Sequence, residues 1–211
     1  MAPLLKFTLA SILVLVLALA GTGLSLAALE KPRFSVAQEF DGWEIRDYEP
    51  RLEARVTVQA DSLQQAGSLG FRVLANFIFG GNVPSESISM TSPVTTREST
   101  KIAMTAPVST ERDEEGRWTI AFTMPSEYSL ETLPRPLDDR VQIVQVSGGR
   151  WAAARFNGRA SDRHAAKTAE LDASLRGAGF LPVGPAVVAQ YNPPSVPPPM
   201  RRNEVLLPIA R

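Results

Sequence analysis

The sequence contains no cysteine and only one histidine, His164, in 211 residues. The absence of cysteine excludes disulfides, thiolate metal sites, iron–sulfur clusters and cysteine nucleophiles. A single histidine leaves little room for a Ser-His-Asp triad or a multi-histidine metal centre. Most familiar catalytic machinery is therefore missing, and we expect a protein that acts through its shape and apolar surface rather than as an enzyme.

The chain also lacks an excess of charge of either sign, with 22 Lys and Arg residues against 22 Asp and Glu residues. A nucleic-acid-binding protein usually carries surplus positive charge, so no nucleic-acid partner is expected. Hydrophobic residues make up 44% of the chain and charged residues 21%, as in an ordinary globular protein. This length and composition predict one folded domain.

The first 29 residues are nearly uncharged: Lys6 is the only charged side chain before Glu30, and Leu9–Ala20 is almost purely apolar. A short basic start, an apolar core and small residues after it are typical of a secretory signal peptide, with cleavage after Ala27. Phe7–Leu29 is also long enough to span a bilayer, so a membrane anchor is the alternative. Either segment predicts a periplasmic, secreted or membrane-anchored protein whose folded part lies outside the cytoplasm.

Two hydrophobic periods alternate along the rest of the chain. A period of two indicates strands with one wet face, and spacings of three and four indicate helices. Asp61 and Gln64 form the predicted N-terminal cap of the first helix, and Gly80-Gly81-Asn82 ends it. We expect strands at 43–48, 52–58, 118–124, 141–146, 150–156, 187–191 and 203–209, and helices at 63–77 and 161–178.

The connections between these elements suggest a topology. Gly148 and Gly149 predict a β-hairpin between 141–146 and 150–156. Pro208 predicts an edge position, or a frayed end, for the last strand. A short repeat relates 88–96 to 102–110, and the halves 43–124 and 140–209 have the same element order. The predicted fold is α+β: one domain, a pseudo-symmetric distorted antiparallel β-barrel flanked by two helices.

Few side chains suggest a binding role on their own. His164 lies one turn into the second helix beside Asp162, where an exposed or capping role competes with a weak candidacy as a metal ligand. Arg201 and Arg202 could hold a carboxylate, or could form ordinary surface ion pairs. Met200 follows the proline-rich segment 192–199, which predicts a stiff loop that closes over a ligand at little entropic cost.

Five short motifs occur in order along the folded part. They are Tyr48-Glu49-Pro50, Phe77-Ile78-Phe79-Gly80-Gly81-Asn82, Lys101-Ile102-Ala103-Met104-Thr105-Ala106-Pro107-Val108, Phe122-Thr123-Met124-Pro125-Ser126, and Tyr191-Asn192-Pro193-Pro194 leading to Arg201-Arg202-Asn203-Glu204-Val205. With these motifs, residues 34–211 resemble the SOUL haem-binding protein family. The resemblance implies a barrel of two four-stranded sheets with flanking helices, in agreement with the element order.

The resemblance also implies a tetrapyrrole ligand, either haem or a free-base porphyrin, in a shallow apolar cleft between the first helix and the proline-rich loop. Two positions where some family members carry basic side chains are occupied here by Leu69 and Phe77. The expected ligand-binding residues are Leu69, Arg72, Val73, Phe77, Val196, Met200, Arg201 and Arg202. We expect Phe77→Asp to weaken binding and to leave the fold intact.

Two other functions remain open at this stage. A small hydrolase would need a cleft carboxylate with a raised pKa, and Glu39, Glu44 and Glu204 are the candidates. A membrane-tethered scaffold would instead use the proline-rich loop to bind a protein partner.

Overall fold

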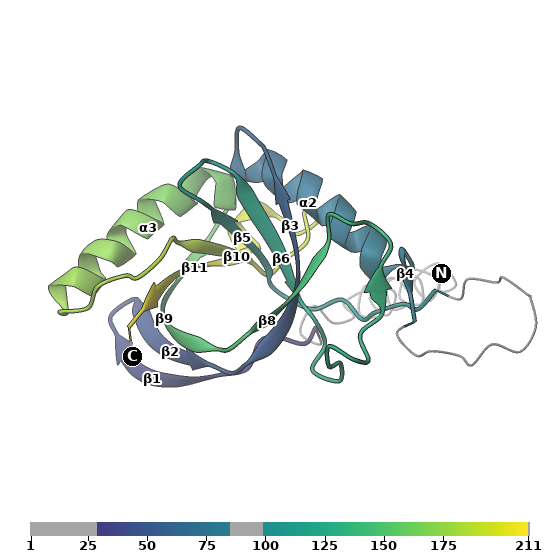
Figure 1. The fold of residues 1–211 in the computed structure, drawn as a ribbon. Coiled ribbons are helices and arrows are strands. Elements are labelled where there is room, and N and C mark those ends of the chain that lie inside the picture. The colour runs from purple at the N-terminus through teal and green to yellow at the C-terminus, as the bar shows by residue number, and fades with distance from the viewer. Residues whose placement is uncertain (1–28, 85–98, 211) are drawn as a thin grey trace, which may run out of the picture.

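The computed structural model describes residues 29–84 and 99–210, and its main feature is one large curled antiparallel sheet (Figure 1). The sheet has nine strands in the order β1-β2-β9-β11-β10-β5-β6-β3-β8. The strands are β1 (Phe34–Phe40), β2 (Trp43–Tyr48), β3 (Arg51–Val58), β5 (Val108–Arg112), β6 (Trp118–Thr123), β8 (Gln142–Val146), β9 (Gly149–Asn157), β10 (Val187–Gln190) and β11 (Arg202–Ile209).

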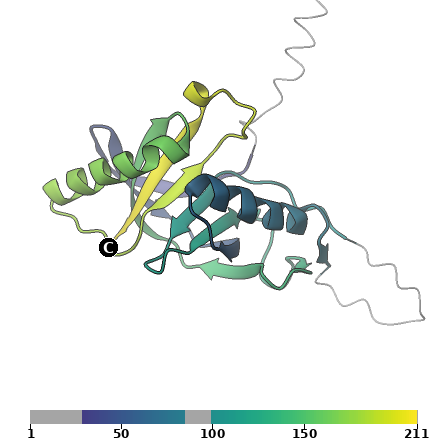
Figure 2. The same ribbon diagram turned by 90° about the horizontal axis from the view of Figure 1, so that it is seen from above.

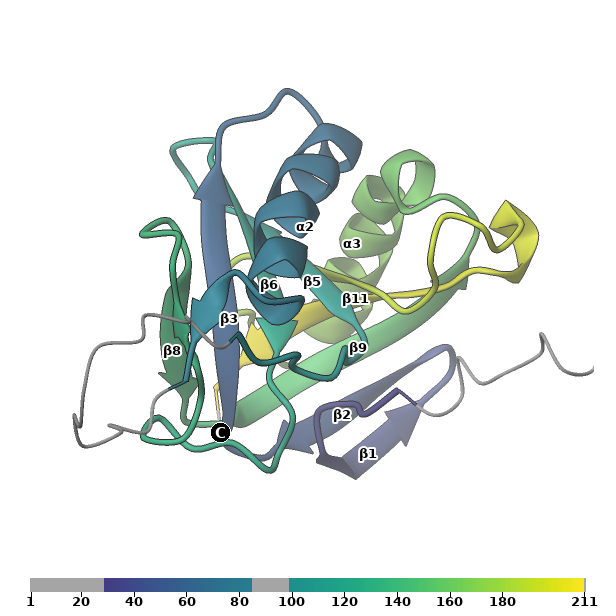
Figure 3. The same ribbon diagram turned by 90° about the vertical axis from the view of Figure 1, so that its right-hand side faces the viewer.

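Two helices, α2 (Leu63–Ile78) and α3 (Ala160–Gly177), lie on the same side of this sheet (Figures 1 and 3). Viewed from above, α2 and α3 cover different parts of it (Figure 2). A small sheet pairs β4 (Asn82–Val83) with β7 (Arg135–Pro136), and a 3-10 turn, η2 (Pro198–Met200), lies in the proline-rich loop. The α+β fold class predicted from the sequence is confirmed.

The predicted barrel of two four-stranded sheets is instead one continuous curled sheet, a half-barrel with β1 and β8 at its two edges. Its halves, β2-β9-β11-β10 and β5-β6-β3-β8, are joined where β10 pairs with β5, from Val187 opposite Glu111 to Gln190 opposite Val108. This central pairing satisfies backbone groups that two separate sheets would leave at open edges. The pseudo-symmetric order of the two halves is retained within the single sheet.

The predicted hairpin of 141–146 with 150–156 is wrong, because β8 pairs with β3 and β9 pairs with β2 and β11. The first strand of each half therefore pairs with strands of the other half: β2 lies beside β9, and β8 lies beside β3. Gly148, at φ +80, makes the turn between β8 and β9, and a Cβ there would lie 2.4 Å from the Tyr48 carbonyl oxygen. The turn is thus packed against the end of β2, where only glycine fits.

The last strand is central and not at an edge, which corrects the prediction drawn from Pro208. β11 pairs with β10 only from Asn203 to Leu206, so Pro208 lies beyond that ladder and removes no hydrogen bond from it. On its other side β11 pairs with β9 along its whole length, and the Pro208 carbonyl accepts a hydrogen bond from the Val183 amide at 2.8 Å.

Helix α2 begins at Leu63 as predicted, but its N-terminal cap is Ser62, one residue later than the predicted Asp61. The Ser62 side chain accepts from the Gln65 amide at 3.2 Å, and the Gln65 side chain accepts from the Asp61 amide at 2.9 Å. The pattern is a variant of the capping box, in which the glutamine accepts from the residue before the cap rather than from the cap itself. Gly80, at φ +124, follows the last turn, so the predicted glycine stop is confirmed.

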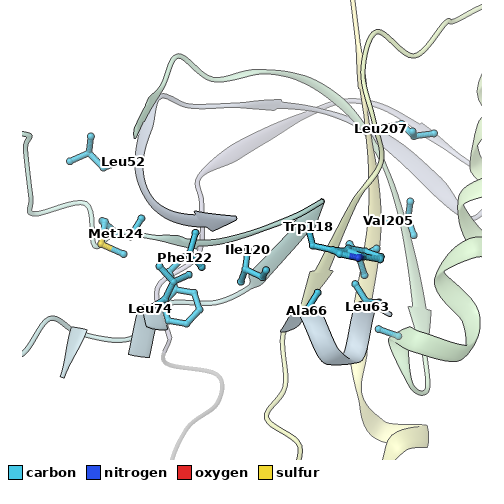
Figure 4. Close-up of a cluster of buried hydrophobic side chains, with 14 of the residues drawn as sticks. Leu52, Leu63, Ala66, Leu74, Trp118, Ile120, Phe122, Met124, Val205 and Leu207 are labelled. Atoms are coloured by element: carbon cyan, nitrogen blue, oxygen red, sulfur yellow. The ribbon is translucent and has the colours of Figure 1, made fainter. Parts of the chain in front are cut away.

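The core lies between the two helices and the sheet. Leu63 and Leu74 of α2 lie over Trp118, Ile120 and Phe122 of β6 (Figure 4). At Gly70 the helix approaches the sheet so closely that a Cβ would lie 2.5 Å from Cγ1 of Ile120. Within residues 29–84 and 99–210, no helix lies on the opposite face of the sheet.

Two predictions fall outside the described residues. The N-terminal segment lies almost wholly in 1–28, and the first copy of the short repeat lies entirely in 85–98. Among the described helices, none is long and apolar enough to cross a membrane.

Candidate functional site

We call the side of the nine-stranded sheet opposite the two helices the uncovered face. Because side chains alternate along a strand, this face receives every second residue of each strand. On β3 these are Arg51, Glu53 and Arg55, while Leu52, Ala54 and Val56 join the core under α2. A small apolar cluster of Ala153, Val187, Ala189 and Leu206 lies on the uncovered face, with Trp151 and Tyr191 packed against it.

The uncovered face is hollowed, with a cavity of about 320 Å³, which we call the central hollow. Both halves of the sheet line it, and neither helix contributes a residue. Its aromatic lining consists of Phe34, Tyr48, Trp151 and Tyr191, and its apolar lining includes Ala121, Val146, Val187 and Leu206. Its charged lining consists of Lys31, Arg51, Arg55 and Arg202 with Glu53 and Glu111.

A buried carboxylate, Glu204, organises one side of the hollow and is completely shielded from solvent. Arg46 donates to both of its oxygens, from Nη1 at 2.7 Å and Nη2 at 3.2 Å, and Arg202 Nη2 donates at 2.6 Å. The Tyr191 hydroxyl donates to Glu204 Oε2 at 2.7 Å. Four donors therefore surround a single negative charge.

These contacts fix the protonation states of the network. Burial opposes ionisation of Glu204, but the hydrogen bonds and charges of Arg46, Arg202 and Tyr191 outweigh it and lower the pKa of Glu204 to about 2. Burial raises the pKa of Tyr191, and the neighbouring Glu204 charge raises it further. Burial also raises the pKa of Tyr48, against the opposing charge of Arg46. The carboxylate is ionised and both phenols are neutral at neutral pH.

A continuous chain of contacts links Glu204 to the other side of the hollow. Arg46 Nη1 donates to the Tyr48 hydroxyl at 3.0 Å, and the Arg51 guanidinium lies 5.5 Å from the centre of the Tyr48 ring. Arg51 in turn donates from Nε to Glu53 Oε1 at 2.7 Å. At the far end, the Arg202 guanidinium lies 4.4 Å from the centre of the Tyr191 ring. Two arginine–tyrosine pairs thus lie at the two ends of one network.

Two arginines of the hollow keep unused hydrogen-bond donors. Among the described residues, three buried side-chain polar atoms have no partner: Arg51 Nη1, Arg202 Nε and Thr110 Oγ1. A buried donor without an acceptor costs about 1–3 kcal/mol, so native proteins seldom leave one without a reason. Neighbouring protein atoms shield both nitrogens, but the two side chains remain partly exposed, at 19% for Arg51 and 32% for Arg202, and both line the hollow.

The residues expected to form the ligand cleft are dispersed by the structure. On α2, Leu69 (37% exposed) and Arg72 lie at the surface, whereas Val73 and Phe77 are buried in the core at 9% and 1% exposure. Burial of Phe77 overturns the expectation that Phe77→Asp would leave the fold intact, because the substitution would put an unpaired carboxylate into the core.

The expected residues of the proline-rich loop also have different environments. Met200 is 72% exposed and Val196 is half-buried. Arg201 holds the loop itself, since its Nε donates to the Val196 carbonyl at 2.7 Å and its Nη2 to the Pro194 carbonyl at 2.6 Å. Only Arg202 of the expected set lines the central hollow.

No candidate metal ligand gains support from its surroundings. His164 lies on α3, outside the hollow, with Nδ1 3.0 Å from the Ala160 carbonyl one turn earlier. Within residues 29–84 and 99–210, no group of three or more His, Cys, Asp or Glu side chains could hold a metal ion.

The acidic candidates for a hydrolase are arranged unfavourably for acid catalysis. Glu204 is ion-paired and has a lowered pKa, Glu44 pairs with Arg46 at 2.6 Å, and Glu39 lies exposed on β1. A carboxylate that sequence analysis did not select, Glu111, lines the hollow, and burial raises its pKa in spite of the nearby Arg55.

Some of the hollow could have been identified in the sequence. The alternation in 51–58 puts Arg51, Glu53 and Arg55 on one face, and Tyr48 and Tyr191 belong to the motifs already singled out. Nothing in the sequence indicates which sheet face the helices leave uncovered, so these residues could not be assembled into a site.

Comparisons with known proteins agree with this architecture. A family model described as the SOUL heme-binding protein matches residues 29–208. Among curated proteins, none matches this chain.

Solved structures show the same fold at low sequence identity. A hydrolase from Listeria innocua is 12% identical over 80% of this chain and 91% of that one, with a TM-score of 0.53. The C-terminal domain of EcmrR is 8% identical over 80% of this chain and 97% of that one, with a TM-score of 0.56. An uncharacterized conserved protein from Listeria innocua is 13% identical over 87% and 94%, with a TM-score of 0.51. At these identities the likeness concerns the fold alone.

Proposed function

Because the chain belongs to the SOUL haem-binding protein family, we propose that it binds a haem-like tetrapyrrole in the central hollow of the uncovered face. The observation that carries this placement is an apolar floor set between aromatic rings. Val187 and Leu206 form part of the floor, and Trp151 and Tyr191 pack beside them. A flat, largely apolar macrocycle gains most from such a surface, because burial of apolar area is the main favourable contribution to binding.

The size of the hollow supports partial enclosure of the ligand. At about 320 Å³ it lies near the lower end of the range of roughly 300–1,000 Å³ that is usual for ligand pockets. We therefore expect one edge of the macrocycle to be enclosed and the other to remain in solvent. Phe34, 38% exposed at the rim, is placed to cover part of the exposed face.

Recognition is expected to depend on the macrocycle rather than on its metal. Haem would supply an iron centre, but the residues that line the hollow include no histidine, methionine or cysteine. The phenols of Tyr48 and Tyr191 stay protonated because burial raises the pKa of each, so neither offers an anionic ligand. Haemin and free-base protoporphyrin should consequently bind with similar affinity.

A titration of the purified protein with haemin and with protoporphyrin tests the function. We expect a saturable shift of the Soret band at micromolar protein concentrations for both ligands. No saturable shift for either one would reject tetrapyrrole binding altogether.

Blocking variants then test the placement. Ala121→Trp adds a bulky ring to the wall of the hollow and should weaken binding at least ten-fold. Leu69→Glu and Met200→Glu alter exposed side chains near the alternative cleft of α2 and the proline-rich loop and should leave binding unchanged. Loss of binding in these two variants alone would favour the alternative cleft over the hollow.

We further propose that the protein works outside the cytoplasm, either released after cleavage at Ala27 or tethered by Phe7–Leu29. The support is the uncharged apolar stretch that precedes the folded domain. Cell fractionation of the full-length chain and N-terminal sequencing of the product test this proposal. A cytoplasmic product that retains Met1 would contradict both forms of it.

A hydrolase is the second candidate function, favoured by Glu111 alone. This carboxylate lines the hollow, and burial raises its pKa, as a general acid or base requires. Hydrolysis of a chromogenic ester that disappears in Glu111→Gln would establish it. Equal turnover by the wild-type protein and this variant would remove its only support.

A further inference from the structure

The partly exposed arginines of the central hollow point to the part of the ligand that is recognised there. Resting on the proposed tetrapyrrole function, we infer that the hollow selects a macrocycle bearing carboxylates, with Arg51 and Arg202 binding the acidic edge inside the hollow. The basis is geometric: each guanidinium lies over a tyrosine ring and donates one hydrogen bond to a glutamate, and each side chain lines the hollow with part of its surface exposed.

The stacking holds both arginines in place before a ligand arrives. Arg202 lies between its ion pair with Glu204 at 2.6 Å and the ring of Tyr191. Arg51 lies between its ion pair with Glu53 at 2.7 Å and the ring of Tyr48. Side chains fixed in this way lose little further entropy when they bind an anion. A planar guanidinium also matches a carboxylate better than an ammonium group does.

The charge around the hollow favours an anion. Within the network, four arginines (Arg46, Arg51, Arg55 and Arg202) face three glutamates (Glu44, Glu53 and Glu204), and every one of these glutamates is ion-paired. The network therefore retains one positive charge, and Lys31 at the rim adds another. Glu111 also lines the hollow and reduces the surplus when it is ionised, but Arg51 and Arg202 form no ion pair with it within 4.0 Å.

Two separate positively charged positions suit a ligand with two carboxylates. Arg51 lies on β3 and Arg202 on β11, so they approach the hollow from different halves of the sheet. The chain of Tyr48, Arg46 and Glu204 joins them and fixes their relative positions. A porphyrin with two propionates on one edge could contact both arginines at once.

The decisive experiment compares mesoporphyrin IX with its dimethyl ester on the wild-type protein, followed by Soret absorbance. The two ligands share the macrocycle and differ only in the acidic groups. We expect the diester to bind at least ten-fold more weakly than the free acid. Equal binding of both would overturn the inference and leave tetrapyrrole binding intact. Failure of both ligands to bind would reject the proposed function and the inference with it.

Arginine variants locate the selectivity on the protein. Arg51→Met and Arg202→Met should each weaken binding of the free acid at least five-fold and leave binding of the diester unchanged. Arg140→Met is the matched control, because Arg140 is exposed and pairs with Asp138 away from the hollow. An equal loss for both ligands would show a purely structural role. If Arg202→Met does not fold, the comparison of mesoporphyrin IX with its dimethyl ester on the wild-type protein still tests the inference.

Discussion

The two faces of the sheet are built on different physical principles. The covered face joins α2 and α3 in one apolar core, where residues such as Ala54 and Ile120 are completely buried. The uncovered face buries charge instead, with Glu204 at 0% and Arg46 at 4% exposure. The covered face thus depends on volume and close packing, and the uncovered face depends on matched donors and acceptors. Damage to each face should therefore have a different signature.

The largest effect is expected for a charge placed in the covered face. Phe77→Asp should destabilise the protein by about 4 kcal/mol or more, since it removes a buried ring and buries an unpaired carboxylate. Phe79→Asp is the control, because Phe79 is 57% exposed at the end of the same helix and should cost less than about 1 kcal/mol. Urea unfolding followed by circular dichroism measures both. Similar losses in the two variants would contradict the assignment of the core.

On the uncovered face, the expected signature is loss of a charge partner. Glu204→Ala removes the fully buried carboxylate partner of Arg46, leaves it only the partly exposed Glu44, and should cost about 3–5 kcal/mol. Glu44→Ala removes a more exposed partner of the same arginine, 26% exposed, and should cost about 1 kcal/mol or less. Equal effects in urea unfolding would show that Glu204 is not the centre of the network.

The same network predicts how stability depends on pH. The pKa of Glu204 is lowered from 4.5 to about 2 in the folded protein, so its ionised form contributes stability above pH 4.5. This contribution, roughly 3 kcal/mol, is lost as the pH falls from 4.5 towards 2. Urea unfolding at several pH values should show the loss in the wild-type protein and a shallower dependence in Glu204→Gln. Parallel pH profiles for the two proteins would contradict the prediction.

The smallest effects test close packing on α2. A Cβ at Gly70 would lie 2.5 Å from Ile120, so Gly70→Ala should destabilise the protein by about 1–3 kcal/mol. A Cβ at Gly67 would meet nothing within 4 Å, so Gly67→Ala should stabilise it by about 0.5–1 kcal/mol. Thermal melts of the two single variants should show a lower melting temperature for Gly70→Ala and a higher one for Gly67→Ala than for the wild-type protein. Stabilisation by both substitutions would mean that the helix stands further from β6 than the structure indicates.

Local patterns were sufficient to predict most of the elements. The spacing of apolar residues in 63–77 gave α2 to within one residue, and the alternation in 118–124 gave β6. Even the displaced cap involves neighbours, Ser62 and Gln65, which lie within one turn of each other. Such features depend on contacts between residues close in sequence, so a single sequence contains the information.

Features that depend on distant residues were not predictable. The salt bridge of Arg46 with Glu204 joins positions 158 residues apart. The strands on either side of Gly148 and Gly149 pair with β3 and β2, which are distant in sequence, and not with each other as the glycines suggested. The candidate site has the same character. Arg202 was selected as part of a basic pair, but its partners Tyr191 and Glu204 become relevant only once β10 and β11 are paired.

The exchange of first strands between the halves also has a consequence during synthesis. One neighbour of β3 in the sheet is β8, and one neighbour of β2 is β9, which begins at Gly149. Both partner strands are synthesised only in the second half of the chain. An unfinished chain therefore carries open strand edges for most of its translation, and such edges readily pair with other chains. Neither half can close alone, so a nascent molecule held unfolded until release would be protected from aggregation.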